Sequence, residues 1–200
     1  MPEAVAAIQE LRRRLFVDRL GWSLNVSGAR EIDQFDTDHA VYCAVYKGAE
    51  LVGCFRAISA RHPYLARTVF PELAQFCAYP THSDVWEISR LGFLADQDPE
   101  SGRIVYAAMF LFARLVKARS LVALVDLCHE RLLRRLGIRT RRFGEPQVIG
   151  EDRSGRTLRG VAGEIPMQGQ GAGIQELLSL LTQVEVINVA HIFRSEAVSA

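Results

Sequence analysis

Residues 40–58 read AVYCAVYKGAELVGCFRAI, two apolar runs joined by a short polar segment. β-Branched, aromatic and cysteine side chains fill both runs, and the KGAE between them contains a glycine, so the pattern predicts a β-hairpin. A turn centred on Gly48-Ala49 brings Cys43 and Cys54 face to face and places Arg56 in the second arm. We therefore expect two antiparallel strands that carry one arginine among apolar side chains.

Downstream of the hairpin, strand and helix patterns alternate. Residues 63–76 have helical spacing that Pro71 interrupts. A strand is expected at 85–93, a strongly apolar helix at 103–119 and a buried strand of the parallel type at 121–125. The remaining expected elements are a helix at 130–136 that ends at Gly137, a strand at 140–143, a strand pair around the DRSGR turn and a helix at 174–181. This alternation predicts an α/β fold, a central mixed sheet flanked by helices on both faces.

The strand at 85–93 contains two charged residues at an unusual spacing. Glu87 and Arg90 are three apart, whereas side chains on one face of a strand are two apart. The two side chains would point to opposite faces of a regular strand. If they act together, the strand must contain a bulge or a splayed end.

Upstream of the hairpin, the chain begins with an amphipathic helix. Apolar residues between Val5 and Phe16 recur at helical spacing, and three arginines at 12–14 lie along the edge of that stripe. Gly21 and the turn-like residues 25–28 follow. The segment from Trp22 onward is therefore a long connection, and long connections inside compact domains are usually functional.

This connection is dense in acids. Glu31, Asp33 and Asp36 lie within six residues, and Arg56, Glu87 and Arg90 follow within the next sixty or so. Ionisable groups at this density, in a chain of otherwise ordinary composition, indicate a functional site and not a solvated surface.

Composition limits the remaining possibilities. The 200 residues fit one domain, with 49% hydrophobic and 24% charged residues and a formal net charge of +1. So small a charge provides no global attraction for nucleic acid or membrane, and no apolar run is long enough to span a bilayer. We expect a cytoplasmic protein with reduced cysteines, since the four cysteines show no CxxC spacing for a metal or redox site.

The charged and aromatic residues also carry a family resemblance. Their order and spacing resemble the signature of the acyl-homoserine lactone synthases, the autoinducer synthases of quorum sensing. The positions are Arg12, Phe16, Trp22, Glu31, Asp33, Asp36, Arg56, Phe70, Glu87 and Arg90. The resemblance covers roughly residues 8 to 166 and implies an acetyltransferase-like (GNAT-like) fold. It also implies a single domain over residues 1–200, in which a flexible segment of about 1–36 covers the adenosylmethionine site.

The implied reaction joins an acyl thioester to S-adenosylmethionine. The amine of adenosylmethionine attacks the thioester, and its carboxylate then displaces methylthioadenosine to close the lactone. No prosthetic group and no metal are implied. Both substrates present charges and rings that the signature residues suit.

The resemblance assigns the N-terminal block to adenosylmethionine. A sulfonium next to an adenine favours aromatic faces, here Phe16 and Trp22. The ammonium favours the carboxylates Asp33 and Asp36, with Glu31 and Phe70 in support. The ligand carboxylate favours a guanidinium, and the candidates are Arg12, Arg56 and Arg90. Glu87 is the candidate base, directly or through a water, or else an orienting group if an arginine lowers its pKa. Asp36, Arg56 and Arg90 complete the expected catalytic group.

The acyl donor requires two further surfaces. An apolar slot for the acyl chain is expected between the 103–119 helix and the following strand, at Met109, Phe110 and Leu124. Six arginines between 131 and 142 form a basic patch for acyl carrier protein or for the phosphates of coenzyme A, with Arg131, Arg134, Arg135 and Arg142 as its members. A solvated basic face is the other interpretation of these arginines.

Two other functions remain open from the sequence. An acyl-CoA N-acyltransferase acting on another amine would have no need of the aromatic and acidic N-terminal block. Its pyrophosphate cradle would also be glycine-rich, whereas residues 95–102, ADQDPESG, contain three acids and one glycine. A non-catalytic ligand-sensing domain of the same fold is the second alternative.

Overall fold

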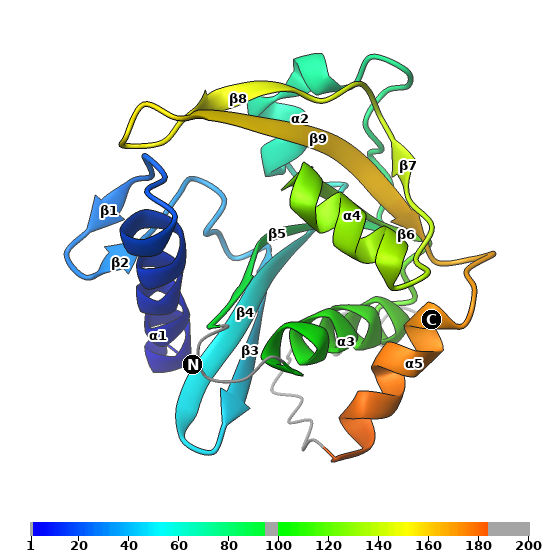
Figure 1. Cartoon of the computed structure of the whole chain (residues 1–200), viewed down its shortest axis with the longest axis horizontal. Coiled ribbons are helices and arrows are strands. Elements are labelled where there is room, and N and C mark those ends of the chain that lie inside the picture. The colour runs from blue at the N-terminus through cyan, green and yellow to red at the C-terminus, as the bar shows by residue number, and fades with distance from the viewer. Residues whose placement is uncertain (1, 95–99, 184–200) are drawn as a thin grey trace, which may run out of the picture.

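The computed structural model describes residues 2–94 and 100–183. Within these ranges, seven strands form a mixed sheet in the order β3-β4-β5-β6-β9-β7, with β8 paired to β9 (Figure 1). The strands are β3 (Ala40–Lys47), β4 (Glu50–Ser59), β5 (Val85–Phe93), β6 (Ser120–Asp126), β7 (Arg141–Arg142), β8 (Gln147–Glu151) and β9 (Thr157–Pro166). A separate pair, β1 (Val26–Ser27) and β2 (Arg30–Glu31), lies within the connection before β3. The predicted α/β fold with a mixed sheet is confirmed.

Helices cover both faces of this sheet. They are α1 (Pro2–Arg12), η1 (Arg13–Arg19), α2 (Leu65–Val69), η2 (Pro71–Leu73), α3 (Glu100–Leu115), α4 (Leu127–Arg135), α5 (Gly173–Ser179) and η3 (Leu180–Gln183). Alternate residues of β4 show which helix lies on which face. Phe55 packs in the core with α3 and α5, whereas Cys54 packs with α1 and Ile58 packs with α2. The face that carries α1 and α2 therefore holds two separate apolar clusters.

The hairpin forms as predicted, except for its register. β3 and β4 are antiparallel, and Lys47 pairs with Glu50 across the Gly48-Ala49 turn. A bulge between Val45 and Tyr46 then shifts the pairing by one residue, so Cys43 lies opposite Phe55. The expectation that Cys43 and Cys54 face each other was wrong, because one bulged residue moves the two thiols to opposite faces of the sheet.

β5 contains the bulge that its charge spacing requires. Arg56 of β4 pairs with Ser89 and Cys54 pairs with Gly92, so two residues of β5 lie opposite Phe55. Arg90 is one of the two, with φ of 53°, a backbone conformation that few residues other than glycine adopt. The predicted bulge is confirmed, and it turns Arg90 to the face that Glu87 occupies.

The sheet opens between its two central strands. β5 and β6 are parallel but pair over only three residues, from Val85 with Ser120 to Glu87 with Val122. Beyond them β5 follows β4 as far as Phe93, while β6 follows β9 as far as Asp126. The two halves of the sheet therefore diverge after Glu87, and α4 begins where β6 ends.

Three predicted boundaries differ from the structure. The first helix is α-helical only to Arg12 and continues as a π-helix, η1, which buries the consecutive residues Leu15, Phe16 and Val17. π-Helices are rare and frequently lie at functional sites. α4 begins at Leu127 and not at 130, because Asp126 caps it by accepting the backbone N–H of Cys128 and of His129. The 103–119 helix is α3, which ends at Leu115.

Candidate active site

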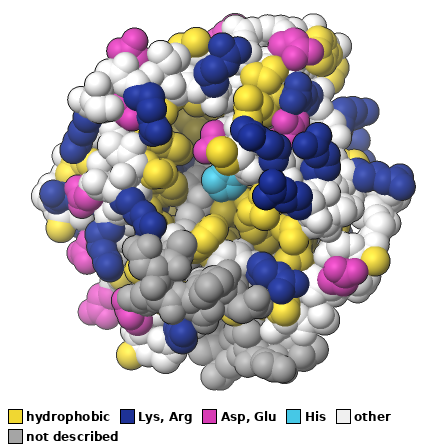
Figure 2. Space-filling view, viewed as in Figure 1, with side chains coloured by type: hydrophobic (Ala, Val, Ile, Leu, Met, Phe, Trp, Pro, Cys, Tyr) yellow, Lys and Arg dark blue, Asp and Glu magenta, His cyan; other side chains and the backbone are white. Residues whose placement is uncertain are grey.

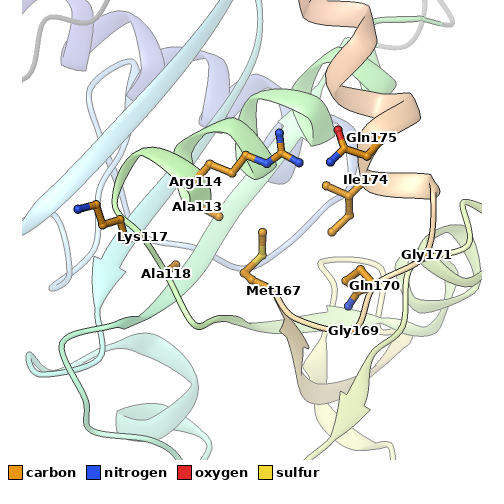
Figure 3. A pocket seen from close by; sticks show the side chains of 10 residues that line it. All are labelled: Ala113, Arg114, Lys117, Ala118, Met167, Gly169, Gln170, Gly171, Ile174 and Gln175. Carbon is orange, nitrogen blue, oxygen red and sulfur yellow. The ribbon is translucent and has the colours of Figure 1, made fainter.

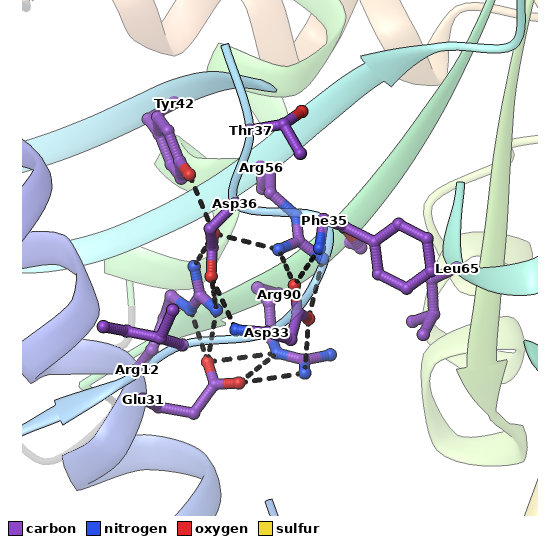
Figure 4. Close-up of polar contacts among 12 residues, drawn as sticks. Arg12, Glu31, Asp33, Phe35, Asp36, Thr37, Tyr42, Arg56, Leu65 and Arg90 are labelled. Atoms are coloured by element: carbon purple, nitrogen blue, oxygen red, sulfur yellow. Dashed lines mark hydrogen bonds and ion pairs between the residues drawn. The ribbon is translucent and has the colours of Figure 1, made fainter. Parts of the chain in front are cut away.

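Six charged side chains from four parts of the chain meet on the α1 face of the sheet (Figure 4). We call this group the charged cluster: Arg12, Glu31, Asp33, Asp36, Arg56 and Arg90. The arginines come from α1, β4 and β5, and the acids come from β2 and the connection after it. The sequence predicted all six residues, and the structure brings all six together.

Arg12 and Asp36 form the innermost pair. The two terminal nitrogens of Arg12 donate to the two oxygens of Asp36 at 2.7 and 3.0 Å, a bidentate contact. Nε of Arg12 donates to Glu31 at 2.5 Å. The side chains of Arg12 and Glu31 are fully buried.

Arg56 and Arg90 connect the remaining acids. Arg56 donates to both oxygens of Asp33, at 2.5 and 3.0 Å, and to Asp36 at 2.9 Å. Arg90 lies 3.0 Å from Glu31 and 2.9 Å from Asp33. Each arginine therefore contacts two acids and each acid contacts two arginines.

Three positive and three negative charges leave the cluster formally neutral. Burial by itself would raise the pKa of Asp36, but the hydrogen bonds and charges of Arg12 and Arg56 outweigh it and hold that pKa below its ordinary value. Burial also acts to raise the pKa of Asp33, but the hydrogen bond from Arg56 and the charges of Arg56 and Arg90 outweigh it and lower that pKa. Both acids are therefore ionised near neutral pH.

Three residues that sequence reasoning missed support the cluster. The Tyr42 hydroxyl donates to Asp36 at 2.7 Å, Arg56 Nε donates to the Ser89 hydroxyl at 3.2 Å, and the Arg56 guanidinium lies 5.7 Å from the ring centre of Phe35. Tyr42 and Ser89 are the cross-strand partners of Arg56 in β3 and β5. The correct hairpin register would have identified Tyr42.

The aromatic pair lies against the cluster's strand. The rings of Phe16 and Trp22 are stacked, with centroids 5.2 Å apart and planes inclined by 21°. Phe16 packs on Gly92 of β5, where an added Cβ would lie about 3.0 Å from the Phe16 ring. Trp22 is half-buried and Phe16 is buried. The predicted pair of aromatic side chains thus packs against β5 at Gly92, two residues beyond Arg90.

Glu87 contacts the start of α2. Its two carboxylate oxygens accept the backbone N–H groups of Leu65, at 3.0 Å, and Ala66, at 2.8 Å, at the start of α2. Its residue is only 1% exposed. Burial raises its pKa to about 7, against the opposing effects of the two backbone N–H groups and of Arg56 and Arg90. Phe70, at the other end of α2, packs in the apolar cluster beneath α2.

The expected acyl slot is divided by the sheet. Met109 and Phe110 of α3 are buried in the core between α3 and the sheet. Leu124 packs with the cluster beneath α2, because along β6 Leu121 faces α3 and Val122 and Leu124 face the other side. Leu124 therefore does not line one slot with the two α3 residues, and that part of the prediction was wrong.

The basic patch is a hollow on the surface of α4. A hollow of about 550 Å³ is lined by residues of α4 and of the segment after it, including Arg131, Arg134, Arg139 and Arg142. Arg135 is exposed but is not among the lining residues. Arg142 is paired, because Nε and a terminal nitrogen donate to Glu130 at 2.6 and 2.7 Å. Figure 2 shows Lys and Arg side chains gathered on this part of the surface.

Comparison with known proteins decides the family. The model of the family described as autoinducer synthase matches residues 3–158. The chain belongs to the autoinducer synthase family. A relative from Aeromonas salmonicida, named acyl-homoserine-lactone synthase, is 33% identical over 86% of this chain and 90% of its own length. Another of that name from Ralstonia solanacearum is 35% identical over 75% of this chain and 79% of its own length. The synthase is accordingly an acyltransferase that makes an acyl-homoserine lactone.

Solved structures agree with this fold. TofI in a ternary complex with an inhibitor and MTA superposes with a TM-score of 0.75 at 33% identity, covering 90% of the synthase and 94% of TofI. BjaI, a CoA-dependent acyl-homoserine lactone synthase solved with SAM and isopentyl-CoA, has a TM-score of 0.81 at 20% identity, over 94% of the synthase and 86% of BjaI. The BjaI likeness shows the fold alone.

Other features lie away from the charged cluster. A second hollow of about 390 Å³ lies between α3, α5 and the segment from Met167 to Gly171, with Arg114 and Gln175 on its walls (Figure 3). Among the described residues of the synthase there is no metal-binding group of three or more His, Cys, Asp or Glu side chains, and no helix long and apolar enough to cross a membrane. Most of the acidic connection 95–102 lies outside the described residues.

Proposed function

We propose that the charged cluster and the Phe16–Trp22 pair form the adenosylmethionine site of this acyl-homoserine-lactone synthase. The single observation that carries the proposal is the position of a stacked aromatic pair beside a neutral set of three arginines and three carboxylates. Adenosylmethionine presents a sulfonium and an adenine ring for the aromatic faces, and an ammonium and a carboxylate for the charged groups.

The exposed edge of the cluster defines where the ligand meets it. The Arg12, Glu31 and Arg56 side chains are fully buried, whereas Asp33 is 14% and Arg90 is 8% exposed. We propose that the ligand's ammonium contacts Asp33 and that its carboxylate contacts Arg90. A zwitterionic head group adds no net charge, so the cluster remains neutral when the ligand binds.

The buried members of the cluster then hold this edge in position. Asp33 is fixed by two hydrogen bonds from Arg56, and its backbone N–H donates to Asp36 at 2.9 Å. Arg12 fixes Asp36 in turn. Positioning of this kind favours both steps of the reaction, because attack on the thioester and closure of the lactone each depend on alignment.

Glu87 acts in this proposal as an orienting group. Both of its oxygens bind backbone N–H groups at the start of α2, so we propose that it positions α2 beside the cluster. The ammonium then loses its proton through water. A pKa of about 7 allows Glu87 to change charge near neutral pH, which suits a group coupled to that transfer.

The acyl donor approaches from the opposite face. β5 and β6 stop pairing after Glu87 and Val122, and Met109 and Phe110 lie in the apolar core beneath α3. We propose that the acyl chain occupies this region and that Arg131 and Arg134 meet the acidic part of the donor, either coenzyme A phosphates or an acyl carrier protein. BjaI was solved with SAM and isopentyl-CoA, and TofI with an inhibitor and MTA. These ligands support adenosylmethionine and an acyl thioester as the two substrates.

The N-terminal segment belongs to the same unit. Arg12 of α1 binds acids of the connection, and α1 packs on β3 and β4. We propose that residues 1–200 form a single domain in which the segment up to Asp36 covers the adenosylmethionine site. Because both substrates are made inside the cell, we propose that the synthase acts in the cytoplasm.

The deciding experiment supplies adenosylmethionine with a panel of acyl-CoA and acyl carrier protein donors and measures methylthioadenosine and lactone together by mass spectrometry. Equal amounts of both products are expected, and the best donor identifies the carrier. Free coenzyme A without methylthioadenosine, once another amine is supplied, would indicate the general N-acyltransferase. Tight adenosylmethionine binding with no turnover of any donor would indicate the sensing domain.

A further inference from the structure

A histidine and an aspartate meet at the first turn of α4. Asp126, the last residue of β6, accepts the backbone N–H groups of Cys128 and His129 at 2.8 and 3.0 Å. The same oxygen lies 3.3 Å from Nδ1 of His129. The helix cap therefore also holds the imidazole in one orientation, with Nδ1 toward the carboxylate and Nε2 directed away from it.

The environment of this pair suits proton transfer. The hydrogen bond from His129 is the largest of the effects that lower the pKa of Asp126 to about 2, so Asp126 is a carboxylate at neutral pH. The His129 ring lies 6.5 Å from the ring of Tyr106, a buried residue of α3. With 36% of its side chain exposed, His129 can exchange protons with solvent while one side faces the apolar core.

The pair lies where β6 ends, four residues beyond Val122, the last residue of β6 that pairs with β5. β5 and β6 separate after Glu87 and Val122, and α4 starts where β6 ends. In Figure 1 the start of α4 lies above α3 and in front of the sheet. The same view in Figure 2 shows a hollow on this face of the molecule, with hydrophobic side chains on its floor and Lys and Arg side chains beside it. Arg131 and Arg134 of the basic patch follow along α4.

In the proposed function the donor's acidic part lies against Arg131 and Arg134, and its acyl chain enters the core beneath α3. His129 lies on the first turn of α4, two residues before Arg131, so we place the donor's sulfur near this turn. We infer that His129 is the general acid that protonates the departing thiolate of the acyl donor, and that Asp126 positions it. This inference rests on the proposed transfer from a thioester.

The proton balance of the step is complete. The neutral amine attacks the carbonyl carbon, and the tetrahedral intermediate expels the thiolate with the electron pair of the C–S bond. Nε2 of the imidazolium gives its proton to that sulfur, while Nδ1–H stays bonded to Asp126. The nitrogen of the new amide releases one proton to solvent, and solvent returns one to Nε2. An alkyl thiol with a pKa of about 8.5 leaves less readily as a free anion than as a thiol, so a general acid lowers this barrier.

Varying the leaving group tests this role directly. His129→Gln is compared with the unmodified enzyme on an acyl-CoA and on the thiophenyl ester of the same acyl group, whose thiolate is stable enough to leave without a proton. Turnover of the acyl-CoA should fall about 100-fold, and turnover of the thiophenyl ester less than about threefold. Equal losses with both esters, or no loss with either, would overturn the assignment.

Three further variants separate chemistry from structure. Cys128→Ala, an exposed neighbour on the same turn, should leave both rates unchanged. Asp126→Asn retains a good helix cap but not the charge, so it should show a smaller loss with the same preference for the thiophenyl ester. His129→Ala should regain acyl-CoA turnover when imidazole is added, and failure of this rescue would count against the assignment. Absence of lactone and methylthioadenosine from the unmodified enzyme would contradict the proposed function itself, whatever His129 does.

Discussion

The charged cluster and the basic patch contain similar residues in opposite settings. In the cluster, three arginines are buried among three acids, and each makes at least two contacts. On α4, Arg131 and Arg134 are exposed around an open hollow. A buried guanidinium without its partners is strongly destabilising, whereas an exposed one is hydrated and screened by salt. The cluster therefore fixes geometry, and the patch supplies attraction for a partner.

The largest expected effect tests the cluster's side of this comparison. Arg56→Ala leaves Asp33 and Asp36 buried without their shared partner, so the free energy of unfolding should fall by about 3 to 5 kcal/mol. Arg134→Ala on the patch should change it by less than about 0.5 kcal/mol. Urea unfolding of both variants measures the difference, and similar values for the two would remove the distinction between the regions.

The sequence was sufficient to identify the cluster but not its internal pairing. The spacing of Glu87 and Arg90 predicted a bulge in β5, because two charged groups of one site had to share a face. The same reasoning was not applied at Cys43 and Cys54, where Val52 is the extra residue and the neighbouring Gly53 is the sequence sign of a bulge. The pairing of Arg12 with Asp36 joins α1 to a distant connection, and such contacts depend on how the helix packs on the sheet.

Positions and partners that depend on tertiary packing could not be derived from the sequence. Leu124 and Met109 are apolar residues of neighbouring elements, yet the pleat of β6 places them on opposite sides of the sheet. For Glu87 the sequence left a base and an orienting group open, and only the path of α2 shows that its oxygens bind two backbone N–H groups. Arg142 lies in the patch as expected, and the sequence did not show that Glu130 of α4 pairs with it. Sequence spacing identifies residue types and not their partners.

The second prediction concerns Glu87, which is buried and whose carboxylate oxygens accept two backbone N–H groups. Its pKa rises from 4.5 to about 7 on folding, so its contribution to stability is complete below pH 4.5 and is lost as the pH rises through 7. The destabilisation caused by Glu87→Gln should be about 2 to 3 kcal/mol larger at pH 5 than at pH 8. Asp33 and Asp36 titrate in both proteins, so their effects cancel in the difference. A difference in the free energy of unfolding between the two proteins that is constant, or that grows with pH, would show that Glu87 is charged throughout.

The third prediction addresses the aromatic pair that lies against the cluster. Trp22→Ala removes one of the two stacked rings and should weaken adenosylmethionine binding about tenfold by calorimetry, equivalent to about 1.4 kcal/mol. Trp22→Phe retains an aromatic face and should lose less than half of that free energy. If both variants bind as tightly as the unmodified protein, the pair is a core contact between η1 and the loop after it.

The smallest effect is expected on the patch, and it depends most on conditions. The double variant Arg131→Glu/Arg134→Glu should raise the KM for the acyl donor about fivefold at low salt and by less at high salt, because these charges are exposed. The KM for adenosylmethionine should not change. Arg114→Glu/Lys117→Glu makes the same change in net charge around the other hollow, and it should leave both KM values unaltered. Equal increases in the two double variants would assign the effect to the overall charge of the protein, since a local docking surface responds only to the charges that face the donor.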